Sequence, residues 1–382
     1  MKHIYNPLFI LFIFISCSQI TTLENEGHTQ VSNTTQSETN NNALSNQLPQ
    51  QSAIDTGANK KNEKEGIDPD HSHTKDTHKV KTLTFENTKT VKNYCKKIDK
   101  YFKKYNWGKS HCEEYSWHHV RSSYWGNPII WHVFGDENKK TVQNTTLIMC
   151  GVHGDEITPV KFCFDILKDL KHHPEIVKNN LVIIAPLVAP DSFLKTRPTR
   201  TNARGVDVNR NFPTADWSAK AIKLWKSRYR SDKRRFPGHK ASSEQETIFQ
   251  VNIIKRYNPD KILSVHAPLT LIDYDGPIIG QEHGETAHDL LLKMSDKAGK
   301  YKINNYPFFT GSLGNWAGNE RNIPTYTLEL PNSDWNKTDR FFKTFQKAIH
   351  QAIIHDFITP QTKANEKVTE TEEHDKNSDK IL

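Results

Sequence analysis

Short strand-like runs that alternate with helical stretches constrain the fold of this chain more than any other feature. The runs are Thr146–Cys150, Leu181–Pro186, Lys261–Val265 and Thr325–Leu330. Their mostly apolar composition is typical of strands buried on both faces of a sheet. Helices are predicted at Thr158–Leu170, Ser242–Tyr257, Glu285–Lys297 and Asp339–His355. This alternation predicts an α/β fold in which helices cover both faces of a largely parallel or mixed sheet.

Local signals add detail at the helix starts and upstream of the first run. Thr158, followed by a proline, is expected to cap its helix, and Ser242–Glu246 resembles a capping box. Apolar residues recur at helical spacing between Val91 and Phe102. Trp117–Tyr124 and Pro128–Phe134 are expected to form a hairpin.

Both ends of the chain are too polar to fold. Only 35% of the 382 residues are apolar, and residues 18–80 and 359–382 hold few large apolar side chains. Such segments cannot bury enough surface to offset the entropy lost on ordering. We therefore expect a disordered tether, a folded part within residues 81–358, and a disordered tail.

The first 17 residues predict export. An apolar run from Leu8 to Ile15 follows a basic start, and it is too short to span a bilayer but typical of a signal peptide. Ser16-Cys17 resembles the end of a bacterial lipobox, in which the cysteine is acylated, although Phe14 replaces the usual leucine. A plain secretory signal is the alternative. We expect a periplasmic protein anchored to the outer membrane through a lipid on Cys17.

Four further cysteines, Cys95, Cys112, Cys150 and Cys163, favour disulfides in an oxidising compartment. Three pairings are possible. We favour Cys95–Cys112, because both lie in the polar N-terminal part, whereas Cys150 and Cys163 are each also consistent with a buried thiol.

The net charge of +8 does not indicate a nucleic-acid partner. The charge is spread along the chain, and no motif that reads a nucleic-acid groove is present. The densest basic run, Lys226–Arg235, is more typical of a solvated loop than of an anion-binding patch.

Two histidines and a glutamate follow the ends of predicted strands. His153 and Glu156 lie just after the run that ends at Cys150, and His266 follows Lys261–Val265. Ligands of α/β sheets gather beyond the carboxyl ends of the strands, so these side chains are expected to meet. Two histidines and one glutamate leave a coordination position open, as in a catalytic zinc site. Each residue alone is a weak signal, since a strand-end histidine is more often structural.

Two other features suit peptide hydrolysis. Glu329 lies in an otherwise apolar run, where a charge needs a reason. It is either a general base tuned by burial and a nearby metal, or a structural residue in a salt bridge or facing solvent. The run Asn202–Pro213 is rich in amide and guanidinium groups, which suit a substrate that ends in a carboxylate.

Together these motifs resemble the zinc carboxypeptidase superfamily, most closely its murein peptide amidase branch. The matching segments are HGDE (153–156), RGVDVNRNFP (204–213), FPG…SEQET (236–247), SVH (264–266), GSLGNWAG (311–318) and YTLELP (326–331). The resemblance spans about residues 122–358, which leaves 81–121 as an N-terminal elaboration. It implies a three-layer α/β/α fold around a mixed, mainly parallel sheet. It also implies one zinc ion per chain and hydrolysis of the γ-D-glutamyl–diaminopimelate bond of peptidoglycan.

The resemblance also implies roles for individual residues. His153, Glu156 and His266 match the zinc ligands. Glu329 matches the base that takes a proton from the attacking water and passes it to the leaving amine. Asn209 and Arg210 match the pair that grips the terminal carboxylate of the substrate.

Other positions match the family less closely. The arginine that stabilises the oxyanion is Arg197 or Arg200, and we favour Arg200, which leaves Arg197 as a substrate contact. Tyr306 has the spacing of a mobile active-site tyrosine, or is a core aromatic residue. Gly311, Ser312 and Gly314 are expected to shape the cleft wall. Asp155 replaces an arginine of digestive carboxypeptidases, which favours a substrate with an amine near the metal, such as diaminopimelate.

We therefore expect an exported, monomeric zinc carboxypeptidase that acts on peptidoglycan stem peptides. One alternative is a zinc deacylase of the aspartoacylase-like branch, which shares HxxE and an Asn-Arg pair but lacks the long GSLGNWAG…ELP segment. The other is a non-catalytic murein-binding lipoprotein, although every expected catalytic position is filled.

Overall fold

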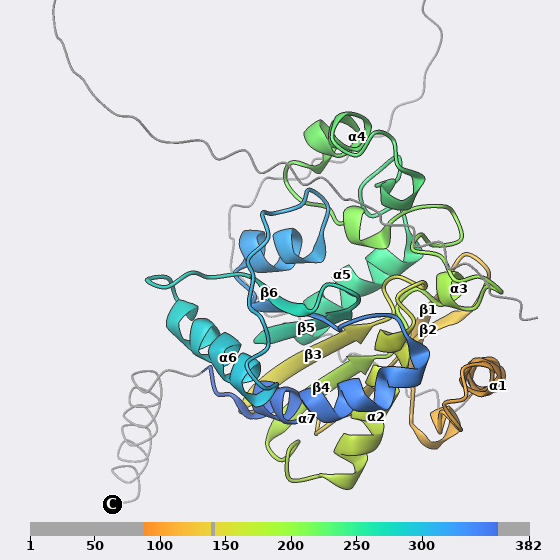
Figure 1. The fold of residues 1–382 in the computed structure, drawn as a ribbon, viewed down its shortest axis with the longest axis vertical. Coiled ribbons are helices and arrows are strands. Elements are labelled where there is room, and N and C mark those ends of the chain that lie inside the picture. The colour runs from red at the N-terminus through yellow and green to blue at the C-terminus, as the bar shows by residue number, and fades with distance from the viewer. Residues whose placement is uncertain (1–87, 139–141, 358–382) are drawn as a thin grey trace, which may run out of the picture. The chain divides into compact units, whose positions relative to one another are not determined.

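The computed structural model describes residues 88–138 and 142–357 (Figure 1). The predicted signal peptide with Cys17, the tether and the C-terminal tail lie outside these residues. No helix in the described ranges combines the length and apolar character needed to cross a bilayer.

The described strands form one mixed sheet in the order β1-β2-β4-β3-β5-β7-β6. The central strands β4, β3, β5 and β7 are parallel, whereas β2 and β6 are antiparallel to their neighbours, as is the edge strand β1. This is the mainly parallel mixed sheet that the sequence predicts. The strand bounds are β1 His118–Ser122, β2 Pro128–Phe134, β3 Asn144–Cys150, β4 Asn180–Ala185, β5 Lys261–His266, β6 Leu271–Asp275 and β7 Thr325–Glu329.

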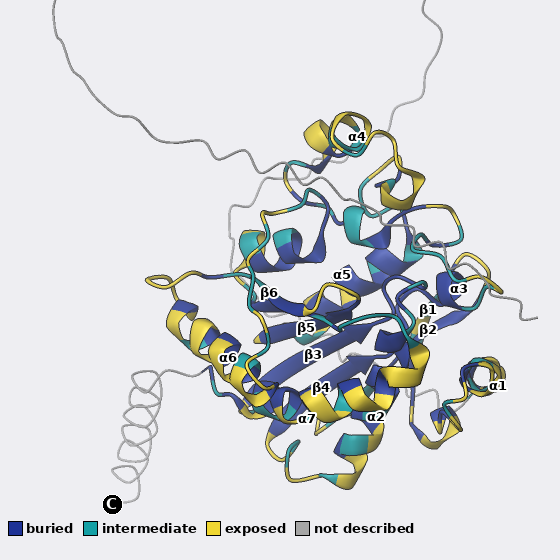
Figure 2. Ribbon diagram, viewed as in Figure 1, coloured by how far each residue is buried: buried dark blue, intermediate teal, exposed yellow. Residues whose placement is uncertain are grey.

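Helices cover both faces of this sheet. Side chains alternate between the two faces along each strand, and the apolar ones on each face pack against helices. Ile148 and Cys150 of β3 join a hydrophobic cluster with α1, α2, α6 and α7, whereas Leu147 and Met149 join a second cluster with α5. Figure 2 shows the buried central strands and the exposed outer surfaces of α6 and α7. The described helices are α1 Lys89–Lys104, α2 Thr158–His172, α3 Pro190–Phe193, α4 Trp217–Ser227, α5 Gln245–Tyr257, α6 Gly284–Lys297 and α7 Thr338–Ile354. Short 3₁₀ turns lie at Cys112–Glu114, Val208–Arg210, Lys233–Arg235 and Trp335–Lys337, and a π-helical turn lies at Gly314–Asn319.

Two predicted helix caps are wrong. Thr158 is the first residue of α2 rather than its cap, and its hydroxyl donates to the carbonyl of Asn332. The α5 helix begins at Gln245 and has no side-chain cap, because the Ser243 hydroxyl donates to the Glu244 carboxylate instead. Strand β6 was not predicted from the sequence, since its last residues are acidic rather than apolar.

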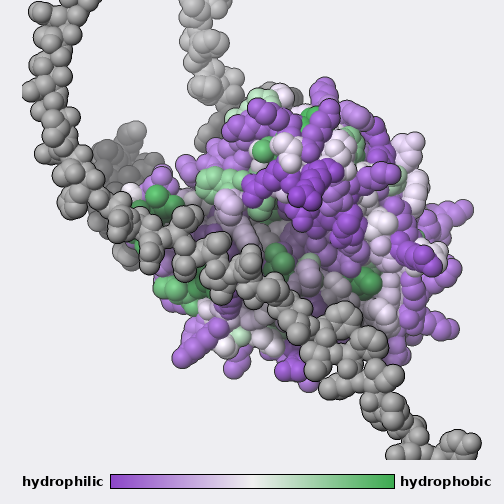
Figure 3. Space-filling model, turned by 45° about the horizontal axis from the view of Figure 1, so that its top comes forward, coloured by the Kyte–Doolittle hydropathy of each residue, from purple (hydrophilic) through white to green (hydrophobic). Residues whose placement is uncertain are grey.

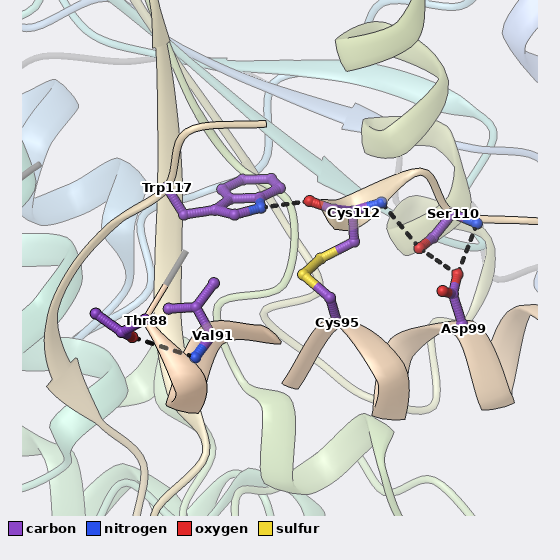
Figure 4. Close-up of a disulfide and its surroundings, with 7 residues drawn as sticks. All are labelled: Thr88, Val91, Cys95, Asp99, Ser110, Cys112 and Trp117. Atoms are coloured by element: carbon purple, nitrogen blue, oxygen red, sulfur yellow. Dashed lines mark hydrogen bonds between the residues drawn. A yellow bond between two sulfur atoms is a disulfide. The ribbon is translucent and has the colours of Figure 1, made fainter. Parts of the chain in front are cut away.

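The N-terminal segment is fastened by the predicted disulfide, Cys95–Cys112, which is confirmed (Figure 4). Trp117 Nε1 donates to the carbonyl of Cys112 at 2.7 Å, and the Ser110 hydroxyl donates to Asp99 at 2.6 Å. Buried side chains of α1 belong to the same hydrophobic cluster as those of α2. The domain boundary predicted after residue 121 falls inside β1.

A second disulfide joins Cys150, the last residue of β3, to Cys163 in α2. The alternative that these two residues are free thiols is therefore wrong. Both cysteines are fully buried. The bond brackets the loop that carries His153 and Glu156.

Candidate active site

The carboxyl ends of β3 and β5 bring the three predicted metal ligands together. Glu156 Oε1 lies 2.8 Å from His153 Nδ1, and Glu156 Oε2 lies 2.8 Å from His266 Nδ1. One ligand atom from each residue lies within 4.8 Å of the other two. All three residues are buried. We call these residues the metal cluster.

The far nitrogen of each imidazole has its own partner. His153 Nε2 lies 2.9 Å from Asp207 Oδ1, and His266 Nε2 lies 3.0 Å from the Ser264 hydroxyl. Such outer partners orient metal-binding histidines and fix their tautomers. Both Nδ1 atoms thus face Glu156, and this set of two imidazoles and one carboxylate fits a zinc ion with an open position.

Arg200 ties the metal cluster to its outer partner. Its Nε donates to Asp207 Oδ2 at 2.9 Å, and its Nη1 donates to Glu156 Oε1 at 3.1 Å. Burial alone would raise the pKa of Asp207, but Arg200 and His153 hold that pKa well below its usual range. Burial would also raise the pKa of Glu156, but His153 and His266 lower it by more. The pKa of Glu156 is therefore well below its usual range. Both carboxylates are therefore charged at neutral pH.

Glu329 ends β7 directly beside the metal cluster. It pairs with His266 in the register of β5 and β7. Its Oε2 accepts a hydrogen bond from the Leu269 amide at 3.3 Å. Burial raises the pKa of Glu329, which is the direction that makes a carboxylate a better proton acceptor. A charge at this position of an apolar strand is explained by the cavity that it faces.

A cavity of about 510 Å³ contains the metal cluster and most other predicted site residues. The predicted residues that line it, apart from the cluster, are Asp155, Arg200, Asn209, Arg210, Tyr306, Ser312, Gly314 and Glu329. Arg197 is exposed and does not line the cavity, so the structure brings only Arg200 of that pair to the site. Gly311 lies behind the wall at φ +77°, where a Cβ would stand 2.1 Å from the carbonyl oxygen of Arg210. Hydrophilic side chains dominate the face of the molecule that carries α4 (Figure 3).

Arg210 presents a guanidinium group with a free hydrogen-bond donor. Its Nη1 donates to the carbonyl of Asn209 at 2.7 Å, and its Cζ lies 4.7 Å from the centre of the Phe309 ring. Its Nε is enclosed and has no partner among the described residues. Asn209 is held in turn, because its Oδ1 accepts from the Leu313 amide at 2.8 Å. This arrangement suits a carboxylate from a ligand.

Three residues of the site were not predicted from the sequence. Asp207 lies in the quoted run 204–213, but only the fold shows that it supports His153. Asp273 and Asp275 of β6 line the cavity, and burial raises the pKa of both, that of Asp275 to about 7. The alternation of acidic residues in LIDYD was the available signal for a strand with one polar face.

A second group of possible ligands, Asp169, His173 and His350, lies on α2, on the residue directly after it and on α7, and does not line the cavity. His173 Nδ1 also contacts the carbonyl of Asp169 at 3.0 Å, and Gln346 donates to the Asp169 carboxylate at 2.6 Å. These contacts make a hydrogen-bond network between two helices.

Comparison with known proteins agrees with this geometry. Residues 98–373 match the zinc carboxypeptidase family. The chain belongs to that family. It is 32% identical over 219 residues to murein peptide amidase A of Escherichia coli strain K12, which covers 56% of this chain and 80% of that protein. It is 31% identical over 189 residues to murein peptide amidase A of Vibrio campbellii, with 48% and 68% covered.

The solved structures support the fold. Bovine thrombin-activatable fibrinolysis inhibitor, solved in complex with tick carboxypeptidase inhibitor, superposes with a TM-score of 0.53 at 17% identity, covering 68% of this chain and 96% of that one. Family membership makes this chain a peptide hydrolase that uses zinc.

Proposed function

We propose that this protein is an exported zinc carboxypeptidase that hydrolyses the γ-D-glutamyl–diaminopimelate bond of peptidoglycan stem peptides. One zinc ion would be held by the metal cluster. The 32% identity to a murein peptide amidase supports this substrate class. Export and a lipid anchor at Cys17 rest on the sequence of the first 17 residues.

The choice of substrate rests on one observation: Arg210 and the two aspartates Asp273 and Asp275 line the same cavity. Diaminopimelate at the C-terminus of a peptide has a terminal carboxylate, and its side chain ends in both an amine and a second carboxylate. Arg210 suits the terminal carboxylate. The two aspartates of β6 suit the amine, because a bound cation favours their charged form and offsets the cost of their burial.

Each residue of the site has a distinct part in the reaction. Zinc, when bound, polarises the scissile carbonyl and acidifies water. Glu329 takes a proton from the attacking water and passes it to the amine that leaves. Arg200 donates hydrogen bonds to the oxyanion of the tetrahedral intermediate, and Asp207 keeps Arg200 and His153 in place. Asn209 and Arg210 hold the end of the substrate.

The test is to incubate the purified protein with L-Ala-γ-D-Glu-diaminopimelate, with and without a chelator, and to weigh the products. We expect release of diaminopimelate that stops when zinc is removed. Glu329→Gln should retain zinc but lose at least about 10³-fold in kcat, since it removes the proton acceptor. His153→Ala should lose zinc as well, measured by elemental analysis. Intact peptide with the wild-type protein, or near-wild-type turnover with Glu329→Gln, would contradict the proposal.

A further inference from the structure

Two arginines from a 3₁₀ turn line the cavity near its mouth. Arg234 and Arg235 belong to the turn Lys233–Arg235, at the end of the basic run of the sequence. The Arg234 side chain is 61% exposed, whereas the Nε of Arg210 in the same cavity is enclosed. Arg234 therefore carries its positive charge nearer to solvent than the position that suits the terminal carboxylate, whereas Arg235 lines a second, small hollow together with Arg210.

This turn is fixed to the active site rather than free. Arg234 Nη1 donates to Asp155 Oδ2 at 2.7 Å, and Asp155 directly precedes the metal ligand Glu156. The Asp232 carboxylate caps the turn by accepting from the Arg234 amide at 2.9 Å. Just after the turn, the carbonyl of Phe236 accepts from the amide of Asp207 at 2.8 Å. The arginines are thus positioned by the residues that support the metal cluster.

Both arginines of the turn retain unused donors, and Arg234 holds its donors beside the metal cluster. A guanidinium has five N–H groups, and in the described part of the chain Arg234 uses only one side-chain contact, that to Asp155. The nearest carboxylate to Arg235 is Asp232, with Nε and Oδ2 3.7 Å apart, beyond hydrogen-bonding distance. The Arg234 side chain is mostly exposed, and an ion pair of that kind contributes only about 0–1 kcal/mol to stability.

The depth of these groups fits one direction of the substrate. Consider a bound peptide whose last carboxylate lies at Arg210 and whose scissile bond lies at the metal cluster. The acyl part of this peptide then extends toward the mouth of the cavity. A glutamyl residue linked through its γ-carboxyl keeps a free α-carboxylate close to the scissile carbonyl. Planar arginine donors match that group.

We propose that Arg234 forms an anion subsite that binds a second carboxylate of the substrate, on the acyl side of the bond that is cut. This inference rests on the proposed function, and it assigns the α-carboxylate of the γ-linked glutamyl residue to this subsite.

The test compares two peptides with the zinc-loaded, full-length protein. One is L-Ala-γ-D-Glu-diaminopimelate, and the other is the same peptide with the glutamyl α-carboxylate converted to a carboxamide. The wild-type protein should cleave the amide with a kcat/KM about 10-fold lower, mostly through KM, as expected for the loss of a charged hydrogen bond. Arg234→Gln should lower kcat/KM on the carboxylate peptide and bring the ratio of the two peptides close to one.

Lys233→Gln is the matched control, because Lys233 lies in the same turn, is exposed and does not line the cavity. It should keep the wild-type ratio. Equal cleavage of both peptides by the wild-type protein, or an unchanged ratio in Arg234→Gln, would overturn the subsite and leave the proposed function intact. Cleavage of neither peptide would overturn both.

Discussion

In the metal cluster, every imidazole nitrogen and both oxygens of Glu156 have a partner within 3.0 Å. Elsewhere in the same cavity, Asp155 Oδ1 and Arg210 Nε are enclosed without a hydrogen-bond partner among the described residues. The first group is preorganised, as a metal site requires. The second group carries polar atoms that are costly to bury unless a ligand or water pairs with them. Under the proposed function, this difference separates residues assigned to the chemistry from residues assigned to substrate binding.

The largest effect in this comparison is expected from removing Arg200, which lines the cavity and donates to Glu156 and Asp207. Arg200→Ala should lower kcat about 10²- to 10³-fold, because it removes a donor to the oxyanion. Zinc content and kcat are to be measured together. Arg197→Ala is the control, since Arg197 is exposed outside the cavity. Equal losses in both variants would remove the distinction between the two arginines.

A smaller effect is expected from weakening the outer partner of the metal cluster. Asp207→Asn should lower zinc affinity about 10- to 100-fold, because His153 loses a charged partner that orients its ring. Competition with a chromophoric chelator measures the affinity. Asp232→Asn alters a carboxylate of the cavity mouth that contacts neither histidine, and its zinc affinity should match that of the wild-type protein. If Asp207→Asn also matches it, the cluster does not depend on outer partners.

The smallest effect concerns stability and its pH dependence. Burial raises the pKa of Asp275 from its ordinary value of 3.8 to about 7, with the charge of Asp273 adding to the shift. The folded protein favours the protonated form of Asp275. The stability that this group contributes is therefore fully present below about pH 3.8 and is lost as the pH rises through about 7. Asp275→Asn should therefore be more stable than the wild-type protein at pH 8, by about 1 to 3 kcal/mol, with a smaller difference at pH 5.

Urea unfolding at the two pH values measures this difference, and the exposed Asp136→Asn is its control. We also expect Asp275→Asn to raise KM for the diaminopimelate peptide, because the proposed function assigns Asp275 to the amine of the substrate. If Asp275→Asn gains no stability at pH 8, the buried, charged carboxylate of Asp275 does not destabilise the fold.

The sequence predicts the fold well where strands are apolar on both faces, as in Thr146–Cys150 and Leu181–Pro186. It fails at β6, whose Asp273 and Asp275 face a cavity and break the apolar pattern. The strand-end positions of His153 and His266 placed them near one another, because parallel strands end at one edge. The support from Asp207 and the contact of Arg234 with Asp155 join segments 54 and 79 residues apart, and no local pattern encodes them.

The buried disulfide between Cys150 and Cys163 closes a ring in the chain, and two of the three cluster residues lie inside it. Closing a loop of this size restricts the unfolded chain by about 3 kcal/mol in the chain-entropy view. The bond also ties the loop that carries His153 and Glu156 to both β3 and α2. Two of the three metal ligands are thus held by a covalent ring, whereas His266 reaches the cluster only through the pairing of β5 with β3.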